Sequence, residues 1–247
     1  MGMYEQYAQV YDASGQLAFS LKMLPYLQRL LERHTAPGKT LLEMACGTGT
    51  VAVSMATAGW RVYGVDGSAH MLAQARAKAE AQGVDVLWSQ QDMRHFVLPE
   101  QVHVATCLYD SLNYMLTSED LSAAFESVSN ALVPGGLYLF DMNTACVMAT
   151  LWAGDTYYSD SDDLSVILTS DFDPQRQRTT VQVTCFQREG ELYRKIRERH
   201  AEQAYPEEHV ATLLADAGLH VEGHYDCFTL QPAGLATFRV MWVARKA

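Results

Sequence analysis

From Lys39 onward, short apolar runs alternate with stretches of helical periodicity, and this alternation constrains the fold more than any other feature. Strands that alternate with helices are typical of βαβ units, because each helix returns the chain along one face of a parallel sheet. The pattern predicts strands at 39–45, 61–66, 84–92, 102–110, 137–143, 219–226 and 236–246, and helices at 49–59, 68–83, 117–136 and 206–218. We therefore expect an α/β fold. Ser68 and Thr117 stand where helix N-caps are expected.

The rhythm changes between residues 155 and 203, which predicts a separate antiparallel unit. Three segments there alternate apolar and polar residues with period two, at 164–173, 178–190 and 191–203. We expect a three-stranded β subdomain at 155–203, inserted into a larger domain made of 1–154 and 204–247. The insert is a candidate lid over a binding site, and a homodimer interface or a structural appendage is the alternative.

Three tyrosines near the N-terminus, Tyr4, Tyr7 and Tyr11, are spaced by three and four residues, which predicts one face of a helix. For Tyr4 the simplest interpretation is packing on the edge of the sheet. Together with the insert, this helix is the part of the chain that the expected sheet does not use, so it is the second candidate for a lid.

The composition indicates an acidic protein without membrane segments. The formal net charge is −11, which repels phosphate backbones, so no nucleic-acid partner is expected. The basic clusters at 176–178 and 194–200 are interpreted as one solvated strand face. No apolar run approaches the roughly 20 residues that span a bilayer, and no signal segment is recognised, so a cytoplasmic location is expected.

Cysteine and histidine, which commonly bind metals, do not occur in this sequence at the spacings typical of metal ligands. The five cysteines are scattered, so we expect reduced, mostly packed cysteines and no metal site. The histidines for which the sequence suggests no partner are expected on the exposed surface, namely His70, His95, His103 and His209.

The carboxyl ends of the predicted strands carry carboxylates and glycines, and open α/β sheets bind their ligands there. The first strand holds Glu43 and leads into a turn with Gly47 and Gly49. The second ends at Asp66, where a carboxylate can accept both hydroxyls of a ribose. Asp92 follows the third strand, where it can accept a hydrogen bond from an adenine amino group. The fourth strand ends in a polar group of Tyr109, Asp110, Asn113 and Tyr114.

In these residues and their order the chain resembles the class I S-adenosylmethionine-dependent methyltransferases, from about Tyr4 to the C-terminus. The resemblance implies a Rossmann-like seven-stranded sheet, mostly parallel with an antiparallel last strand, and S-adenosylmethionine as cofactor. Bacterial small-molecule methyltransferases, among them amino-sugar N-methyltransferases, share the tyrosine-rich N-terminus and the β insert. In the family, the positions of Glu43, Gly47 and Gly49 approach the methionine part of the cofactor. The positions of Asp66 and Asp92 hold the ribose and the adenine.

The resemblance gives a set of candidate cofactor-binding residues: Tyr11, Glu43, Ala45, Cys46, Gly47, Gly49, Asp66, Gly67, Met71, Gln91, Asp92, Met93, Leu108 and Tyr109. Tyr11 matches the position that closes over cofactor and acceptor, so it is also a catalytic candidate. Transfer from a sulfonium needs alignment and exclusion of water, which are worth up to ~7–11 kcal/mol. Asp110 and Tyr114 are candidates for taking or relaying a proton. Tyr114 stands where the amino-sugar enzymes carry a histidine, and a phenol is a poor base near neutral pH.

Other interpretations of the glycine turn and of the function stay open at this stage. A Gly-x-Gly turn also opens NAD-binding domains, but Glu43 would repel a pyrophosphate, and no Lys-Ser/Thr follows as in a P-loop. The fourth strand lacks the Asn/Asp-Pro-Pro-Tyr motif of enzymes that methylate nucleic-acid bases. We expect N- or O-methylation of a small molecule. The alternatives are an RNA- or protein-directed methyltransferase and a non-catalytic cofactor-binding module.

Overall fold

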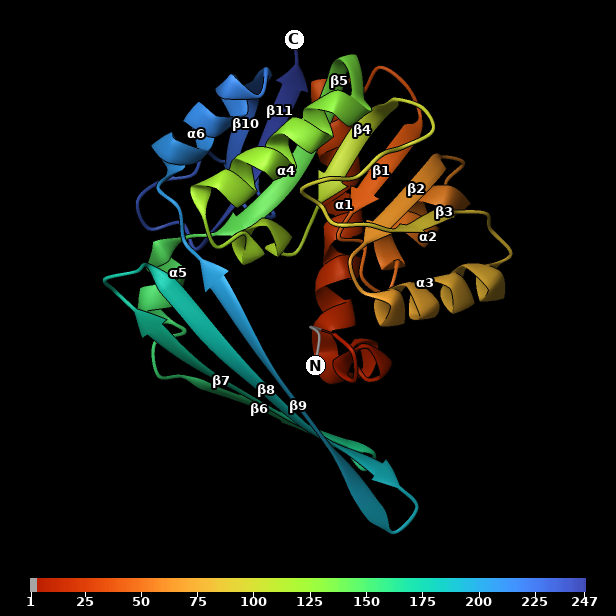
Figure 1. Cartoon of the computed structure of the whole chain (residues 1–247), viewed down its shortest axis with the longest axis vertical. Coiled ribbons are helices and arrows are strands. Elements are labelled where there is room, and N and C mark those ends of the chain that lie inside the picture. The colour runs from red at the N-terminus through yellow and green to blue at the C-terminus, as the bar shows by residue number, and fades with distance from the viewer. Residues whose placement is uncertain (1–3) are drawn as a thin grey trace.

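The computed structural model describes residues 4–247 and contains two sheets (Figure 1). The seven-stranded sheet has the order β10-β11-β5-β4-β1-β2-β3. Its strands are β1 (Thr40–Met44), β2 (Arg61–Asp66), β3 (Leu87–Gln90), β4 (Val102–Cys107), β5 (Leu132–Asn143), β10 (Leu219–Asp226) and β11 (Arg239–Lys246). Strands β1 to β5 pair in parallel, whereas β11 runs antiparallel to both β5 and β10. The expected Rossmann-like sheet with an antiparallel last strand is confirmed.

Helices cover both faces of this sheet, and local signals begin and end several of them. The helices are α1 (Leu17–His34), α2 (Thr50–Thr57), α3 (Ala69–Gln82), α4 (Ser118–Ala131), α5 (Ala145–Thr150) and α6 (Glu207–Asp216). The Ser68 hydroxyl accepts a hydrogen bond from the Met71 amide at the start of α3, and Thr117 accepts from Asp120 at the start of α4. Both predicted caps are confirmed. None of the helices within residues 4–247 is long and apolar enough to cross a membrane.

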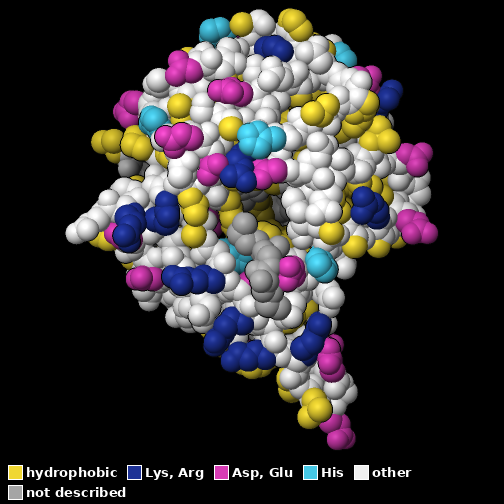
Figure 2. Space-filling view, in the orientation of Figure 1, with side chains coloured by type: hydrophobic (Ala, Val, Ile, Leu, Met, Phe, Trp, Pro, Cys, Tyr) yellow, Lys and Arg dark blue, Asp and Glu magenta, His cyan; other side chains and the backbone are white. Residues whose placement is uncertain are grey.

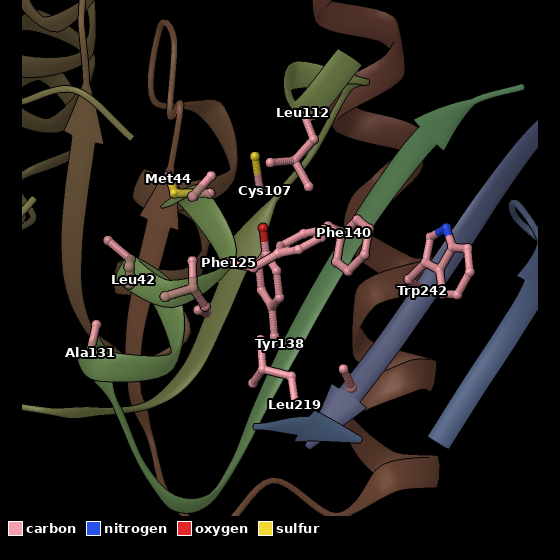
Figure 3. Close-up of a cluster of buried hydrophobic side chains, with 14 of the residues drawn as sticks. Leu42, Met44, Cys107, Leu112, Phe125, Ala131, Tyr138, Phe140, Leu219 and Trp242 are labelled. Atoms are coloured by element: carbon pink, nitrogen blue, oxygen red, sulfur yellow. The ribbon is translucent and has the colours of Figure 1, made fainter. Parts of the chain in front are cut away.

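The core lies on both sides of the sheet because neighbouring strand residues point to opposite faces. On one face, Phe125 of α4 packs against Tyr138 and Phe140 of β5, and Trp242 of β11 stacks on Phe140 (Figure 3). On the other face, residues of α1 and α2 cover the alternate strand positions. The sheet is therefore rigidly held, and the carboxyl ends of β1 to β4 form a fixed edge.

The insert is a four-stranded antiparallel sheet, not a three-stranded one. Its strands are β6 (Thr156–Asp160), β7 (Leu164–Asp173), β8 (Arg178–Glu189) and β9 (Leu192–Gln203), and all lie within the range expected for the inserted subdomain. The prediction missed β6 because four of its five residues are exposed, so no apolar alternation marks it. The β8–β9 hairpin extends away from the main body (Figure 1).

The N-terminal segment does not form the expected single helix. It contains a 3₁₀ turn at Tyr7–Gln9 and a π turn at Asp12–Gln16, and Gly15 adopts a φ of +97° within the second turn. The 18-residue helix α1, for which the sequence analysis assigned no element, follows directly. Tyr4, Tyr7 and Tyr11 still lie together, because they pack on apolar residues of the insert. Aromatic contact with the insert, rather than helical periodicity, places them.

Several predicted boundaries and surface positions are also wrong. The helix expected at 117–136 ends at Ala131, because the chain pairs with β4 from Leu132 onward. Two histidines expected on the exposed surface have partners: His103 contacts the Thr40 hydroxyl, and His209 lies 2.8 Å from the Ser118 hydroxyl. In the cluster at 194–200, Lys195, Arg197 and Arg199 are exposed as expected, whereas His200 is buried.

Candidate active site

A cavity of about 850 Å³ opens at the carboxyl ends of β1 to β4. It brings together most of the residues singled out from the sequence: Tyr11, Glu43, Ala45, Cys46, Gly47, Asp66, Gly67, Met71, Gln91, Asp92, Met93, Leu108, Tyr109 and Tyr114. Gly49 and Asp110 are not among its lining residues. Residues remote in sequence thus converge on one space because the parallel strands all end there.

Glu43 lines this cavity and has one buried carboxyl oxygen without a partner in the described part of the chain. The residue is 5% exposed, and its Oε2 atom has no hydrogen-bond partner among residues 4–247. Burial raises the pKa of Glu43 to about 8. A buried carboxyl group of this kind is stabilised by a cationic donor. The ammonium group of the methionine part of S-adenosylmethionine is such a donor, so this side of the cavity fits the expected cofactor.

The two glycines of the turn have different roles. Both have positive φ, +53° for Gly47 and +72° for Gly49. A Cβ at Gly47 would meet no atom within 4 Å, so the backbone is open on the cavity side. A Cβ at Gly49 would lie 2.7 Å from the Trp88 ring and 2.8 Å from Ala75 Cβ. Gly49 therefore permits close packing of α3 and β3 on the turn, whereas Gly47 leaves space for a ligand.

Asp66 is fixed by the backbone that surrounds it. Its two oxygens accept hydrogen bonds of 2.8 Å from the amides of Gly47 and Ser68. Burial raises the pKa of Asp66, and these two hydrogen bonds oppose that shift. A carboxylate has about four lone-pair positions, so two remain for the hydroxyls of a ribose.

Asp92 is more exposed and already has a partner. It accepts hydrogen bonds from Arg94, including one of 2.6 Å from the guanidinium, and these hydrogen bonds lower the pKa of Asp92 to about 2. An adenine amino group would share this carboxylate with Arg94. Arg94 is in turn paired with Asp120 of α4 at 2.7 Å, so the two acidic residues hold it at the rim of the cavity.

The N-terminal segment is tied to the glycine turn beside the cavity. The Thr48 hydroxyl donates to Asp12 at 2.7 Å, and Lys78 of α3 donates to Asp12 at 2.8 Å and to Thr50 at 2.6 Å. Because Asp12 follows Tyr11 directly, these bonds fix the backbone that carries the Tyr11 ring.

A second cavity, of about 690 Å³, lies between the turn after β4, the N-terminal segment and the insert. The surface of the molecule is hollowed near the centre of the space-filling view (Figure 2). Five residues line both cavities, and all five are aromatic: Tyr4, Tyr11, Phe19, Tyr109 and Tyr114. The two spaces therefore meet at an aromatic junction. Tyr11 and Tyr114, both catalytic candidates, stand at that junction.

The second cavity contains a cluster of buried charges that includes the third catalytic candidate, Asp110. Arg239 donates to Asp110 at 2.9 Å and to Asp141 at 2.5 Å. The Asn143 amide donates to Asp110 at 2.7 Å and to Glu202 at 3.3 Å. Burial and the nearby charge of Asp110 raise the pKa of Glu202 well above its usual range. Two carboxylates thus pair with one guanidinium, and the Asn143 amide links a third carboxyl group, Glu202, to Asp110.

Asp141 also stabilises an unusual backbone. Tyr109 and Asp110 have φ values of +62° and +50°, a conformation that costs a side chain of this kind free energy. The carboxylate of Asp141 accepts hydrogen bonds from both of their amides, at 2.8 Å and 3.1 Å. This arrangement places the Tyr109 ring at the junction of the cavities, stacked 4.0 Å from Phe19.

Several residues of the site were not predicted from the sequence: Phe19, Asp141, His200, Glu202 and Arg239. A charged residue within an apolar strand, as in the Leu139-Phe140-Asp141 run, was the available signal for Asp141. No signal of that kind marks the insert residues, since polar residues alternate throughout β9.

Comparison with known proteins agrees with this geometry. Residues 41–136 match the model of a methyltransferase domain. A "Putative methyltransferase" of Geobacillus sp. (strain WCH70) is 30% identical over 98% of this chain and 99% of its own length. The crystal structure of an S-adenosylmethionine-dependent methyltransferase from Clostridium acetobutylicum ATCC 824 superposes with a TM-score of 0.88 at 25% identity, covering all of both chains. A dTDP-3-amino-3,6-dideoxy-alpha-D-glucopyranose N,N-dimethyltransferase of Streptomyces fradiae is 31% identical over 47% of this chain and 44% of its own.

The family match, the full-length relative and the sheet order agree with one another. The first cavity has an open glycine backbone, a fixed carboxylate at Asp66 and an unsatisfied one at Glu43, which suit the cofactor of that family. The chain belongs to the S-adenosylmethionine-dependent methyltransferases.

Proposed function

We propose that the chain methylates a small amine held in the second cavity, with the cofactor in the first. Glu43 would meet the ammonium group of the methionine part, Asp66 the ribose hydroxyls, and Asp92 with Met93 the adenine. When bound, S-adenosylmethionine supplies an electrophilic methyl group. The observation that carries the proposal is the aromatic junction, because it is the place where the two cavities meet.

An amine is favoured by the charge of the second cavity. Arg239 is its only Lys or Arg lining residue among those described, and Asp110 and Asp141 already pair with that guanidinium. A carboxylate or phosphate would therefore find no free cation, whereas an ammonium group would meet Glu202 and Asp110. The tyrosine rings add cation–π attraction, worth about 0.5–2 kcal/mol for a cation over a ring. The Streptomyces fradiae relative acts, by its name, on an amino sugar, which supports the same class of acceptor.

The alternatives are less well supported. An RNA- or protein-directed enzyme would need an open, basic rim, whereas acidic side chains line the second cavity and residues of the insert form part of its wall. A non-catalytic module would need side chains that block the place of the acceptor, and a space of about 690 Å³ remains there. The expected lid gains support because residues of the insert and Tyr11 line that space together.

The test uses labelled methyl transfer to matched pairs of small molecules. Cyclohexylamine is compared with cyclohexanol and glucosamine with glucose, each with methyl-labelled cofactor, and a metabolite extract is screened in parallel. We expect label in the amines, and Glu202→Gln should raise KM for them. Transfer to the alcohols alone would refute the amine assignment. Transfer to large RNA or protein fractions alone would refute the small-molecule assignment.

A further inference from the structure

His200 is a buried base that none of the roles proposed above uses. It lies on β9, is 3% exposed and lines the second cavity. Its Nδ1 atom is 3.3 Å from the Tyr114 hydroxyl, and that hydroxyl is 2.7 Å from the Tyr4 hydroxyl. Because Tyr4 and Tyr114 line both cavities, this row of polar groups leads from the junction into the insert.

Glu198 decides which nitrogen of the His200 ring carries a proton. Its oxygens accept hydrogen bonds from the backbone amides of Tyr4, Gln6 and Tyr7, at 2.7, 3.1 and 3.0 Å. Burial alone would raise the pKa of Glu198, but the adjacent His200 ring and the hydrogen bonds from these amides lower it, so the carboxylate is ionised at neutral pH. His200 Nε2 lies 3.3 Å from Glu198 Oε2. An anion there favours a proton on Nε2 and leaves the Nδ1 lone pair directed at Tyr114.

The same contact gives the ring a counter-ion. His200 Nε2 is buried and makes no well-directed hydrogen bond among residues 4–247, and the Glu198 carboxylate lies at ion-pair distance from it. An imidazolium formed at His200 would therefore have an anion beside it.

The two phenols cannot keep a proton that leaves the acceptor. Burial raises the pKa of Tyr4 and of Tyr114 well above the usual range, so both stay protonated at neutral pH. A protonated phenol can take a proton on its oxygen only if it gives its own to the next group. In this row the next group is His200 Nδ1.

We propose that His200 accepts the proton released during methyl transfer, through the hydroxyl of Tyr114 and in the tautomer set by Glu198. The acceptor binds as an ammonium group, whose nitrogen has no free electron pair, so one of its protons leaves first. That proton passes to the Tyr114 oxygen while the Tyr114 hydroxyl proton passes to His200 Nδ1. The electron pair freed on nitrogen then bonds to the methyl carbon, the carbon–sulfur bond breaks and its electron pair stays on sulfur. The charge ends as an imidazolium beside Glu198. This inference rests on the proposed transfer to an amine.

Other ionisable groups lie near His200 and must be separated from it. Tyr4 and Tyr114 face its ring, Glu198 and Glu202 lie on the same strand, and Asp110 lines the same cavity. Glu202 is the rival proton acceptor. If Glu202 instead anchors the ammonium group, Glu202→Gln raises KM and leaves the acidic limb of the pH–rate profile in place.

The first measurement needs no acceptor. Long-range ¹H–¹⁵N spectra of the S-adenosylhomocysteine complex, assigned with His200→Gln, report which ring nitrogen is protonated. We expect the proton on Nε2 at pH 8 and an added proton on Nδ1 as the pH falls. A proton on Nδ1 at pH 8 would overturn the proposal, since that nitrogen could not accept from Tyr114.

The second measurement uses cyclohexylamine and glucosamine as acceptors. His200→Gln should lower kcat by about a hundredfold or more, remove the acidic limb of the profile and keep S-adenosylhomocysteine affinity within threefold. Added imidazole should restore part of the rate of His200→Ala. A purely structural role for His200 would not produce such a rescue. Arg199→Gln, on the exposed face of β9, is the matched control and should behave as wild type.

The outcomes separate this inference from the proposed function. Near-normal kcat with an intact acidic limb in folded His200→Gln would overturn the inference while amine transfer stands. If the wild type methylates neither amine, the proposed function fails, and the tautomer measurement alone decides whether His200 can accept from Tyr114.

Discussion

The two glycines of the turn after β1 should respond to alanine in opposite ways. Gly49→Ala should destabilise the fold, and Gly47→Ala should weaken cofactor binding. Both residues have positive φ, which costs a non-glycine residue ~1–2 kcal/mol. Only at Gly49 does the new Cβ also clash, at 2.7 Å from Trp88 and 2.8 Å from Ala75.

The magnitudes follow from these contacts. Overpacking a rigid site costs a further ~1–3 kcal/mol, so Gly49→Ala should lose roughly 2–5 kcal/mol of unfolding free energy. At about 2–4 °C per kcal/mol for a chain of this size, Tm should fall by roughly 4–20 °C. Gly47→Ala should lose only the ~1–2 kcal/mol of unfolding free energy that the positive φ costs. Its methyl group would enter space that the cofactor needs, so cofactor affinity should fall at least tenfold, ~1.4 kcal/mol.

Urea denaturation gives the stabilities, and calorimetry with S-adenosylhomocysteine gives the affinities. Gly83→Ala is the control, because Gly83 also has a positive φ, +64°, and a Cβ there meets nothing within 4 Å. It ends α3 away from the cavity lining, so it isolates the backbone cost. The reasoning is refuted if Gly49→Ala is no less stable than Gly83→Ala, or if Gly47→Ala binds as wild type does.

Three further predictions concern the cavities. Asp66→Ala removes a charged acceptor worth about 1.5–3 kcal/mol per hydrogen bond, so calorimetry should show at least tenfold weaker cofactor binding in a folded variant; unchanged affinity would exclude the ribose role. The pKa of Glu43 is raised from 4.5 to about 8 by burial, so the unfolded chain ionises first and this residue lowers stability as the pH rises between those values. The difference in unfolding free energy between Glu43→Gln and wild type, measured by urea titration, should therefore favour the variant more at pH 8 than at pH 5. A difference that does not change with pH would contradict this. Tyr11→Phe, and separately a shortened insert, should slow turnover about tenfold, ~1.4 kcal/mol on the barrier, with S-adenosylhomocysteine affinity within a few-fold; normal rates in both variants would show that neither is a lid.

The sequence by itself determined the α/β order and the first cavity. Apolar periodicity and capping residues are local, so strands and helices could be located within a few residues, and parallel strands bring their carboxyl ends to one edge. The positions of Glu43, Gly47 and Asp66 near this edge follow from that rule, whereas the cofactor roles predicted for them come from the family resemblance. Local patterns failed where exposure hid the pattern, as in β6, and where aromatic packing replaced helical spacing, as around Tyr7.

Only the tertiary structure decided the acceptor side. The buried charge cluster joins Asp110, Asn143, Glu202 and Arg239 from four separate parts of the chain, and its partners are set by packing between the two sheets. In the same way, the Tyr4 amide donates a hydrogen bond to the carboxylate of Glu198, 194 positions further along the chain. Periodicity tells which face of β9 a residue occupies, but the group that it meets there depends on where the insert docks. The balance of buried charge and the path of a transferred proton depend on these contacts, so they are properties of the folded chain.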